Sequence, residues 1–350
     1  MTMARYSLVF EKPILELEAK LKELRAFSES QNIDVSRELS DLERKIIETK
    51  RQVFKNLTAW DEVQLARHPQ RPYTLDYIGH MCRDFVELHG DRHFADDQAI
   101  VGGFAMLDTE AILILGTQKG RDVKSNVKRN FGMAYPEGYR KALRLMKLAA
   151  KFGRPIITLI DTAGAYPGVG SEERQIAEAI AMNLREAFLL PVPIIVAVIG
   201  EGGSGGALGI GVGDRILILE HAYYSVISPE GCAAILWRDR AFASQAAAAL
   251  KLTSQDLLQA GLVDEIVREP LGGAHTNSQE MTAELKRRLL HHLRELKQVS
   301  LDDLLNRRYQ KFRAMGVMQT EAPASEEIKN VEISAKADPS QAEKMQNEKG

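Results

Sequence analysis

This 350-residue chain contains only two cysteines and carries almost no net charge. Its two cysteines, Cys82 and Cys232, are too few and too far apart for a disulfide framework or a zinc knuckle, which predicts a reducing, cytoplasmic compartment. The net charge of -2 provides no general attraction to nucleic acid or to an anionic membrane. Because His, Cys, Asp and Glu form no cluster with metal-ligand spacing, the sequence predicts no intrinsic metal.

Long hydrophobic runs are also missing. The longest apolar stretch, around residues 189–199, is interrupted by Pro191 and Pro193 and is about half as long as a membrane-spanning helix. The N-terminal residues, MTMARYSLVFEKP, contain neither the apolar segment nor the cleavage site of a secretory signal. With 45% hydrophobic and 27% charged residues, the chain is predicted to be a soluble intracellular protein with a sizeable core.

Glycine, by contrast, is concentrated in two turns that each follow a short apolar run. Residues 155–161 (PIITLID) precede the turn TAGAYPG, and residues 193–200 (PIIVAVIG) precede EGGSGGALG. Such short, β-branched runs are typical of parallel strands buried on both faces. Each turn is predicted to open a helix, and the backbone N–H groups at a helix N-terminus suit the stabilisation of a developing oxyanion.

Strands and helices alternate through the middle of the chain. Residues 100–107 and 111–115 are predicted to form a hairpin, 136–151 a helix, and 215–219 a further strand, which together predict an α/β fold. Residues 12–55 carry two apolar stripes that predict an antiparallel pair of helices. This arm suits either packing on the main domain or binding another subunit. A last amphipathic helix is predicted over 281–313.

The predicted domain organisation has four parts. They are an N-terminal helical arm and linker (1–72), a core (73–270), a C-terminal helical extension (271–318) and a disordered tail (319–350). The linker prediction rests on the two prolines in residues 68–72, and the tail prediction on the polar, aromatic-free sequence after Gly316.

A long polar loop at residues 119–132 is rich in lysine and arginine, and the excess of positive charge continues to residue 154. A loop of this kind is expected to receive an anionic ligand such as a phosphate or a carboxylate. A solvated helix face explains part of the charge. Few aromatic residues are interleaved with it, so the pattern does not favour nucleic acid.

Three other functions fit parts of the sequence. Residues 200–205 (GEGGSG), followed by Glu220, match a dinucleotide-binding fingerprint, although the density of glycines makes the match weak. Ser204 could be a nucleophile at a strand-to-helix elbow, but no histidine lies in a motif that marks it as the base. The helical arm and the charged tail are also compatible with a non-catalytic scaffold.

Three segments together closely resemble the carboxyltransferase alpha subunit of bacterial acetyl-coenzyme A carboxylase. They are PEGYRKALRLM at 136–146, DTAGAYPG at 161–168 and GEGGSGGAL at 200–208. In addition, AGLVDEIV at 260–267 is similar to a segment found across the crotonase superfamily. The resemblance covers about residues 5–318. One departure is Ala163, where the family usually has proline, so a slightly less rigid turn is expected.

The resemblance implies a crotonase-like core of stacked ββα units, with the helical hairpin arm and a C-terminal helix. It also implies transfer of the carboxyl group from carboxybiotin, borne on the biotin carboxyl carrier protein, to acetyl-coenzyme A. The product, malonyl-coenzyme A, begins fatty acid synthesis. The implied partners are a zinc-containing beta subunit, the carrier protein and biotin carboxylase, with an α2β2 heterotetramer inside a larger ATP-dependent complex.

The site implied by the resemblance uses backbone groups rather than a side-chain triad. Gly205 and Gly206 are expected to donate N–H groups to the biotin oxyanion, with Gly164 and Ala165 as a second contributor. The biotin itself then takes the methyl proton, so no protein base is required. The other residues expected to contact biotin or coenzyme A are Gly202, Gly203, Ser204, Tyr166, Lys119, Arg121 and Arg129.

Overall fold

A single mixed β-sheet organises the computed structural model, which describes residues 6–31 and 33–316. The strand order is β1-β2-β3-β4-β5-β6-β8, and β7 pairs with the end of β5. The predicted tail at 319–350 lies outside the described residues. The strands are β1 (Arg83–Glu87), β2 (Ile100–Leu107), β3 (Glu110–Thr117), β4 (Ile156–Thr162), β5 (Ile194–Gly203), β6 (Arg215–Leu219), β7 (Tyr223–Ser225) and β8 (Glu265–Val267).

The direction of the strands follows from their connections. β1, β2 and β3 are antiparallel, and Asp108 adopts a positive φ of 52° in the tight turn between β2 and β3. From β3 onward the pairs β3–β4, β4–β5, β5–β6 and β6–β8 are parallel. Every residue of β4 and β5 is buried, which confirms the prediction of parallel strands covered on both faces.

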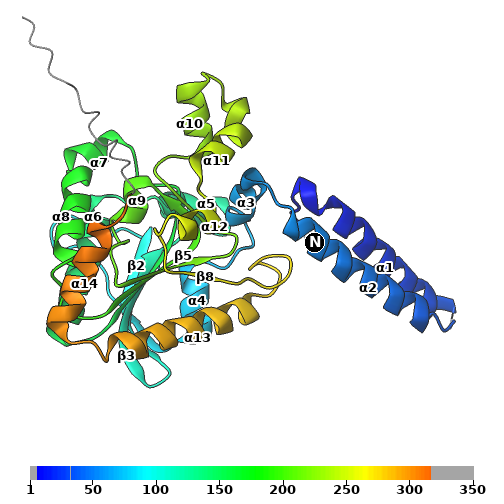
Figure 1. Cartoon of the computed structure of the whole chain (residues 1–350), viewed down its shortest axis with the longest axis horizontal. Coiled ribbons are helices and arrows are strands. Elements are labelled where there is room, and N and C mark those ends of the chain that lie inside the picture. The colour runs from blue at the N-terminus through cyan, green and yellow to red at the C-terminus, as the bar shows by residue number, and fades with distance from the viewer. Residues whose placement is uncertain (1–5, 32, 317–350) are drawn as a thin grey trace, which may run out of the picture. The chain divides into compact units, whose positions relative to one another are not determined.

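Helices cover both faces of the sheet. α6 contacts β2 and β3 and packs beside α8, whereas α4 contacts the same strands and packs on α13 (Figure 1). The α-helices of the core are α3 (Ala59–Ala66), α4 (Thr74–Met81), α5 (Val123–Lys128), α6 (Pro136–Lys151), α7 (Val169–Glu173), α8 (Ile176–Ala187), α9 (Ser204–Leu208), α10 (Pro229–Leu236), α11 (Ala243–Leu250), α12 (Ser254–Gln259), α13 (Ser278–Leu296) and α14 (Leu301–Arg313). Short 3-10 helices are η1 (Val9–Glu11), η2 (Asn130–Gly132) and η3 (Arg240–Phe242). None of the described helices combines the length and the apolar character needed to cross a bilayer.

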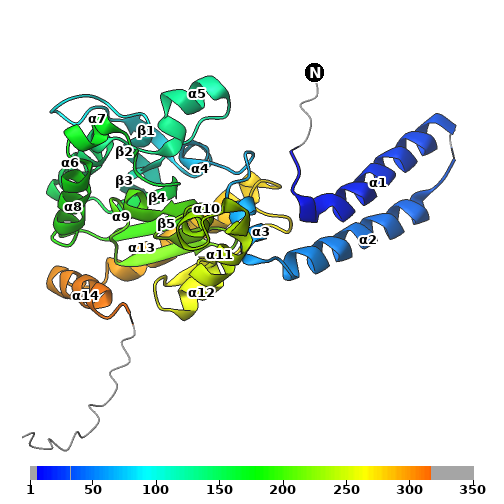
Figure 2. The same cartoon turned by 90° about the horizontal axis from the view of Figure 1, so that it is seen from above.

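The predicted antiparallel arm is present. α1 (Lys12–Gln31) and α2 (Ser36–Lys55) lie side by side (Figures 1 and 2), and Lys50 of α2 forms an ion pair with Glu18 of α1 at 2.8 Å. Each helix has one buried residue among those described, Ile14 in α1 and Ile46 in α2. The role of the arm, as packing element or as subunit contact, stays a prediction.

The segment after α3 has no regular structure, as its prolines predict, but His68, Arg71 and Pro72 within it are buried. His68 and Arg71 expose at most 2% of their surface, and the Arg71 guanidinium donates a hydrogen bond to the Ile199 carbonyl oxygen and pairs with Glu269. The segment predicted as a linker is therefore part of the packed structure. Contacts within the described chain group residues up to Met315 into one unit, and the predicted division into four parts remains a prediction.

The C-terminal helix predicted over 281–313 is divided into α13 and α14. The Ser300 hydroxyl accepts a hydrogen bond from the N–H of Asp303 and starts a second helix there, a signal that the apolar periodicity alone does not reveal. The fully buried Arg308 of α14 pairs with Asp214 at 2.8 Å and donates hydrogen bonds to the carbonyl oxygens of Ala187, Leu190 and Val192. These bonds fasten α14 to the core.

Candidate active site

The two glycine turns, about forty residues apart in the sequence, meet at the carboxyl ends of β4 and β5. These strands are parallel neighbours, and Thr162 pairs with Gly202. A Cβ atom added to Gly203 would lie 2.1 Å from the Ala163 carbonyl oxygen, and one added to Gly206 would lie 2.2 Å from the Gly164 carbonyl carbon. Because no side chain fits at either position, glycine is what permits the two backbones to touch.

The backbone N–H groups of the first turn are not equivalent. The Gly164 N–H donates to the Thr162 hydroxyl at 3.1 Å, and the Tyr166 N–H donates to the Ala134 carbonyl oxygen at 3.0 Å. Between them, the Ala165 N–H has no hydrogen-bond partner among the described residues. Its nitrogen lies 2.4 Å from the position that a Gly206 Cβ would occupy, so this N–H group adjoins the second turn.

The second turn is shorter than its sequence suggests. Strand β5 continues through Gly202 and Gly203, which pair with β7, and the turn starts only at Ser204, whose φ is +48°. Gly205 and Gly206 lie in the first turn of α9, where backbone N–H groups have no partner within the helix. Tyr139 holds this turn by donating a hydrogen bond from its hydroxyl to the Gly206 carbonyl oxygen at 3.2 Å.

This arrangement disfavours the dinucleotide fingerprint. In that motif the glycines form the turn beside the pyrophosphate, whereas here Gly200, Gly202 and Gly203 are strand residues. Glu220, the acidic residue of the proposed fingerprint, instead accepts a hydrogen bond from the backbone N–H of Glu269 at 3.0 Å.

An apolar cavity of about 310 Å³ opens beside the second turn. Ser204 and Gly205 line it together with Leu208, Tyr224, Val226, Leu257, Leu262, Phe312 and Met315, among others. Within the described chain, this lining contains no His, Lys, Arg, Asp or Glu. Ser204 thus has no general base in the cavity it borders, and its surroundings do not support a serine nucleophile.

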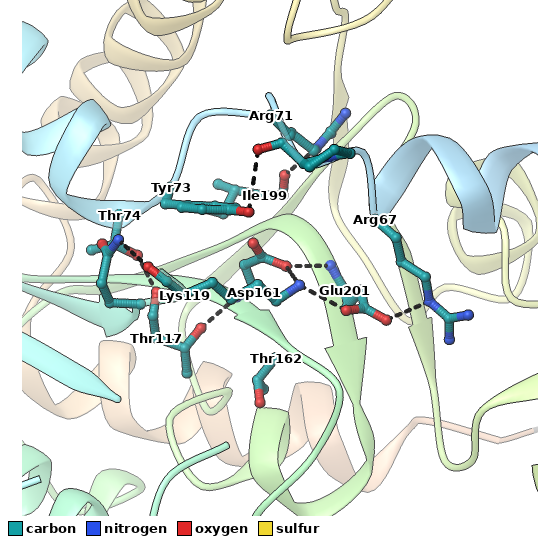
Figure 3. Close-up of polar contacts among 12 residues, drawn as sticks. Arg67, Arg71, Tyr73, Thr74, Thr117, Lys119, Asp161, Thr162, Ile199 and Glu201 are labelled. Carbon is teal, nitrogen blue, oxygen red and sulfur yellow. Dashed lines mark hydrogen bonds and ion pairs between the residues drawn. The ribbon is translucent and has the colours of Figure 1, made fainter. Parts of the chain in front are cut away.

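A buried cluster of charges lies at the same end of the sheet (Figure 3). The Lys119 ammonium, just after β3, lies 2.7 Å from Asp161 Oδ1 of β4 and 2.7 Å from Glu201 Oε2 of β5. Arg67, which follows α3, reaches the other oxygen of Glu201 at 2.6 Å, and the Tyr223 hydroxyl donates to that oxygen at 2.8 Å. The side chains of Asp161 and Glu201 expose only 2% and 8% of their surface.

The charges in this cluster stabilise one another. Burial alone would lower the pKa of Lys119, but Asp161 and Glu201 raise it above its ordinary value. Burial alone would raise the pKa of Glu201, but Lys119 and Arg67 lower it to about 2. The backbone N–H of Glu201 also donates to Asp161 Oδ1 at 3.0 Å. The cluster therefore ties together the ends of three adjacent strands directly before the two glycine turns.

The other basic residues predicted for ligand binding are held by the protein itself. Arg121 donates to the carbonyl oxygens of Pro69 and Arg71, at 2.8 and 2.9 Å, and also pairs with Asp76. Arg129 donates to the Gln98 carbonyl oxygen at 2.8 Å, and burial lowers its pKa.

Tyr166 is placed beside the first turn. Its ring lies 4.4 Å from the ring of Tyr135 between centroids, and it packs so closely on Gly168 that a Cβ there would meet it at 2.4 Å.

Sequence reasoning found both turns but missed most of the charge cluster. Asp161 and Glu201 stand in the quoted motifs, directly before the glycines, and this position at the ends of adjacent parallel strands was the available signal. Arg67 and Tyr223 lie far from them in the sequence, and no local pattern marks either as a partner. Lys119 was singled out as a ligand-binding residue, whereas both recorded contacts of its ammonium group are internal carboxylates.

Comparison with known proteins gives a consistent result. Residues 7–316 match the family described as acetyl co-enzyme A carboxylase carboxyltransferase-like. The chain is 56% identical over 326 residues to the acetyl-coenzyme A carboxylase carboxyl transferase subunit alpha of Chlorobium luteolum, covering 89% of this chain and 97% of the relative. It is 57% identical over 312 residues to the subunit alpha of Geobacter metallireducens, covering 89% and 98%.

A solved structure supports the fold. The transcarboxylase 12S structure aligns with a TM-score of 0.53 at 20% identity, covering 65% of this chain and 42% of that longer chain. This likeness confirms the predicted crotonase-like α/β fold. Together with the family match over nearly all described residues, it shows that the chain belongs to the acetyl-coenzyme A carboxylase carboxyltransferase alpha subunit family.

Proposed function

We propose that this chain is the alpha half of a carboxyltransferase that moves a carboxyl group from carboxybiotin to acetyl-coenzyme A, giving malonyl-coenzyme A for fatty acid synthesis. One observation supports it beyond the family match. The Ala165 N–H, which has no partner in the described chain, adjoins the first turn of α9, at the carboxyl ends of two parallel strands. Two converging backbone donors of this kind form an oxyanion hole.

The surroundings fit biotin as the cofactor on this side. The cavity next to Gly205 is apolar, as a fused-ring ligand with a single polar ureido group requires, and it is bordered by backbone N–H groups at one end. Biotin, when bound, supplies the carboxyl group that is transferred and the base for the methyl proton. The chain's own part is to orient the ligand, to exclude water and to stabilise negative charge on an oxygen.

Within the first turn, the structure favours Ala165 over Gly164 as the donor. The Gly164 N–H is occupied by the Thr162 hydroxyl, which in turn donates to the Gly164 carbonyl oxygen at 2.7 Å. This pair of bonds fixes the turn so that the next N–H, that of Ala165, is held in place. In the second turn, the N–H groups of Gly205 and Gly206 are the candidates. Removal of one such donor typically costs about 10²–10³ in kcat.

Lys119 is better assigned to positioning than to ligand contact. Its ammonium is held by two carboxylates at 2.7 Å each, which leaves it one donor hydrogen and no net positive charge to offer a ligand. We propose that it fixes β4 and β5 in register, so that the two turns stay in contact. Lys124 and Lys128 on α5 are exposed, and in this loop they are better placed than Lys119 to meet coenzyme A phosphates.

The remaining proposals concern partners and location. A zinc-containing beta subunit would complete the site for coenzyme A in an α2β2 heterotetramer, and the biotin carboxyl carrier protein and biotin carboxylase would complete the complex in the cytoplasm. The relatives bear the name subunit alpha, which supports a multi-subunit assembly for this chain.

The test is a reconstitution. The purified chain is assayed for malonyl-coenzyme A formation from carboxybiotin and acetyl-coenzyme A, first alone and then with a carboxyltransferase beta subunit. The proposal expects activity only in the mixture. Full activity from this chain alone would refute the shared site, and absence of activity in a mixture that forms a stable complex would refute the proposed reaction.

A further inference from the structure

Helix α13 presents two adjacent histidines and a glutamate on one face. His291 Nε2 lies 3.5 Å from Glu295 Oε1, and His292 Nδ1 lies 3.5 Å from Glu295 Oε2. The three ligand atoms all lie within 4.8 Å of one another. In a tetrahedral zinc site with bonds of about 2.0–2.1 Å, neighbouring ligand atoms are about 3.4 Å apart. The two distances, each to a different oxygen of Glu295, are close to this value.

A second observation concerns the contacts of His292, which exposes only 8% of its surface. Its Nε2 lies 2.6 Å from Glu265 Oε2 on β8, and a carboxylate can only accept, so Nε2 carries the hydrogen. In the neutral ring Nδ1 is then a bare lone pair. Nδ1 is buried and has no hydrogen-bond partner among the described residues.

Nδ1 of His292 and Oε2 of Glu295 lie 3.5 Å apart, and both are metal-donor atoms when the ring is neutral. A metal ion between them would take both as ligands. The contact of His292 with Glu265 is also the carboxylate–histidine pairing that orients metal-binding imidazoles and raises their basicity.

The neighbouring charges allow this role. Arg288 Nη1 lies 2.9 Å from the other oxygen of Glu265, which leaves Oε2 for His292. Arg215 Nη2 is 4.0 Å from Glu295 Oε2, a weak contact on a half-exposed carboxylate. Both arginines stay in contact with solvent, with 34% and 37% of their side chains exposed, so either can move aside when a cation binds.

We propose that His291, His292 and Glu295 form a binding site for a divalent transition-metal ion of the zinc class, with Glu265 as the residue that orients His292. The two imidazole ligands favour Zn²⁺, Co²⁺, Ni²⁺ or Cu²⁺ over Mg²⁺ and Ca²⁺, which prefer oxygen ligands. Three protein ligands leave a fourth position for water or another ligand. The site is independent of the proposed carboxyl transfer, and it revises the sequence-based expectation of no intrinsic metal.

The test uses the full chain after treatment with a chelator. Co²⁺ is titrated in while its visible absorption is followed, and Zn²⁺ is then added to displace it. One equivalent of Co²⁺ should bind with the spectrum of a site of low coordination number, and Mg²⁺ should give no change. Failure of the wild-type chain to bind one equivalent, or equal binding of Mg²⁺, would overturn the proposal.

Two variants and a control locate the site. His291→Ala removes an exposed ligand without touching the core and should weaken Co²⁺ binding by at least tenfold. Glu265→Gln should weaken it by about 10–100-fold, as loss of an orienting carboxylate does. His80→Ala, at an exposed histidine of α4, should bind like the wild type. Unchanged affinity in His291→Ala, or an equal loss in His80→Ala, would overturn the assignment.

A thermal measurement gives a readout that does not depend on spectra. A ligand that binds only the folded chain raises its unfolding temperature in proportion to the logarithm of the ligand concentration. Zn²⁺ should raise the unfolding temperature of the wild-type chain clearly more than that of His291→Ala. An equal increase in both would place the bound metal elsewhere.

Discussion

Replacing Gly206 with alanine tests the contact between the two glycine turns. The added Cβ would lie 2.2 Å from the Gly164 carbonyl carbon, 2.4 Å from the Ala165 nitrogen and 2.7 Å from the Gly164 Cα. All three are backbone atoms, so no side chain can rotate away. An ordinary carbon–carbon contact is about 3.5–4.0 Å, so the turns must separate by roughly 1 Å or more.

The expected effect falls on kcat. Misplacement of a catalytic group by about 1 Å can cost about 10²-fold, and loss of one oxyanion-hole donor about 10²–10³-fold, which is about 3–4 kcal/mol of transition-state stabilisation. The separation moves the Ala165 N–H away from α9, so both estimates apply to the same event. In the chain reconstituted with a beta subunit, Gly206→Ala should therefore reduce kcat by about 10²–10³-fold and change the KM for acetyl-coenzyme A much less.

The matched control is Gly79→Ala. Gly79 is an exposed residue inside α4 with open space where its Cβ would be, so alanine should leave kcat unchanged and add up to about 1 kcal/mol of helix stability. Circular dichroism and gel filtration with the beta subunit establish that each variant folds and assembles. A folded, assembled Gly206→Ala enzyme with kcat within about threefold of the wild type would refute the proposed oxyanion hole.

Three further predictions concern the buried charges. Lys119→Met should lower the free energy of unfolding in urea by about 3–5 kcal/mol, because it leaves Asp161 and Glu201 buried without their shared cation. A loss below about 1 kcal/mol would contradict the stabilising role of the cluster. The pKa of Glu201 is lowered from 4.5 to about 2, which contributes about 3 kcal/mol of stability. This stability is fully present above pH 4.5 and is lost as the pH falls toward 2, so Glu201→Gln should flatten that part of the stability–pH curve. An unchanged slope would show that other carboxylates cause the pH dependence. Arg308→Met should lower the free energy of unfolding by about 3–5 kcal/mol, because it leaves Asp214 as an uncompensated buried charge. Arg308→Lys should restore only part of this loss, because lysine cannot make all the hydrogen bonds to the backbone carbonyls. Full rescue by lysine would show that those hydrogen bonds add little.

Much of the fold could be predicted because its signals are local. The apolar runs before the glycine turns are β4 and β5, Pro136 starts α6, and Gly153, with a φ of +61°, terminates it. These features depend on residues close in sequence, such as β-branched runs and a fixed proline φ. The break at Ser300 was missed because a side-chain cap interrupts a helix without disturbing its apolar periodicity.

In the candidate site, too, some features follow from local sequence and others only from the tertiary structure. The sequence by itself determined that two glycine turns follow buried strands, and that no histidine lies in a motif that marks it as a base for Ser204. The tertiary structure decided that the turns touch and that Ala165 retains an N–H without a partner in the described chain. It also placed Lys119 between two carboxylates and His292 between Glu265 and Glu295. Each of these depends on groups that are distant in sequence or on the geometry of single hydrogen bonds, and only packing of the sheet and helices brings such groups together.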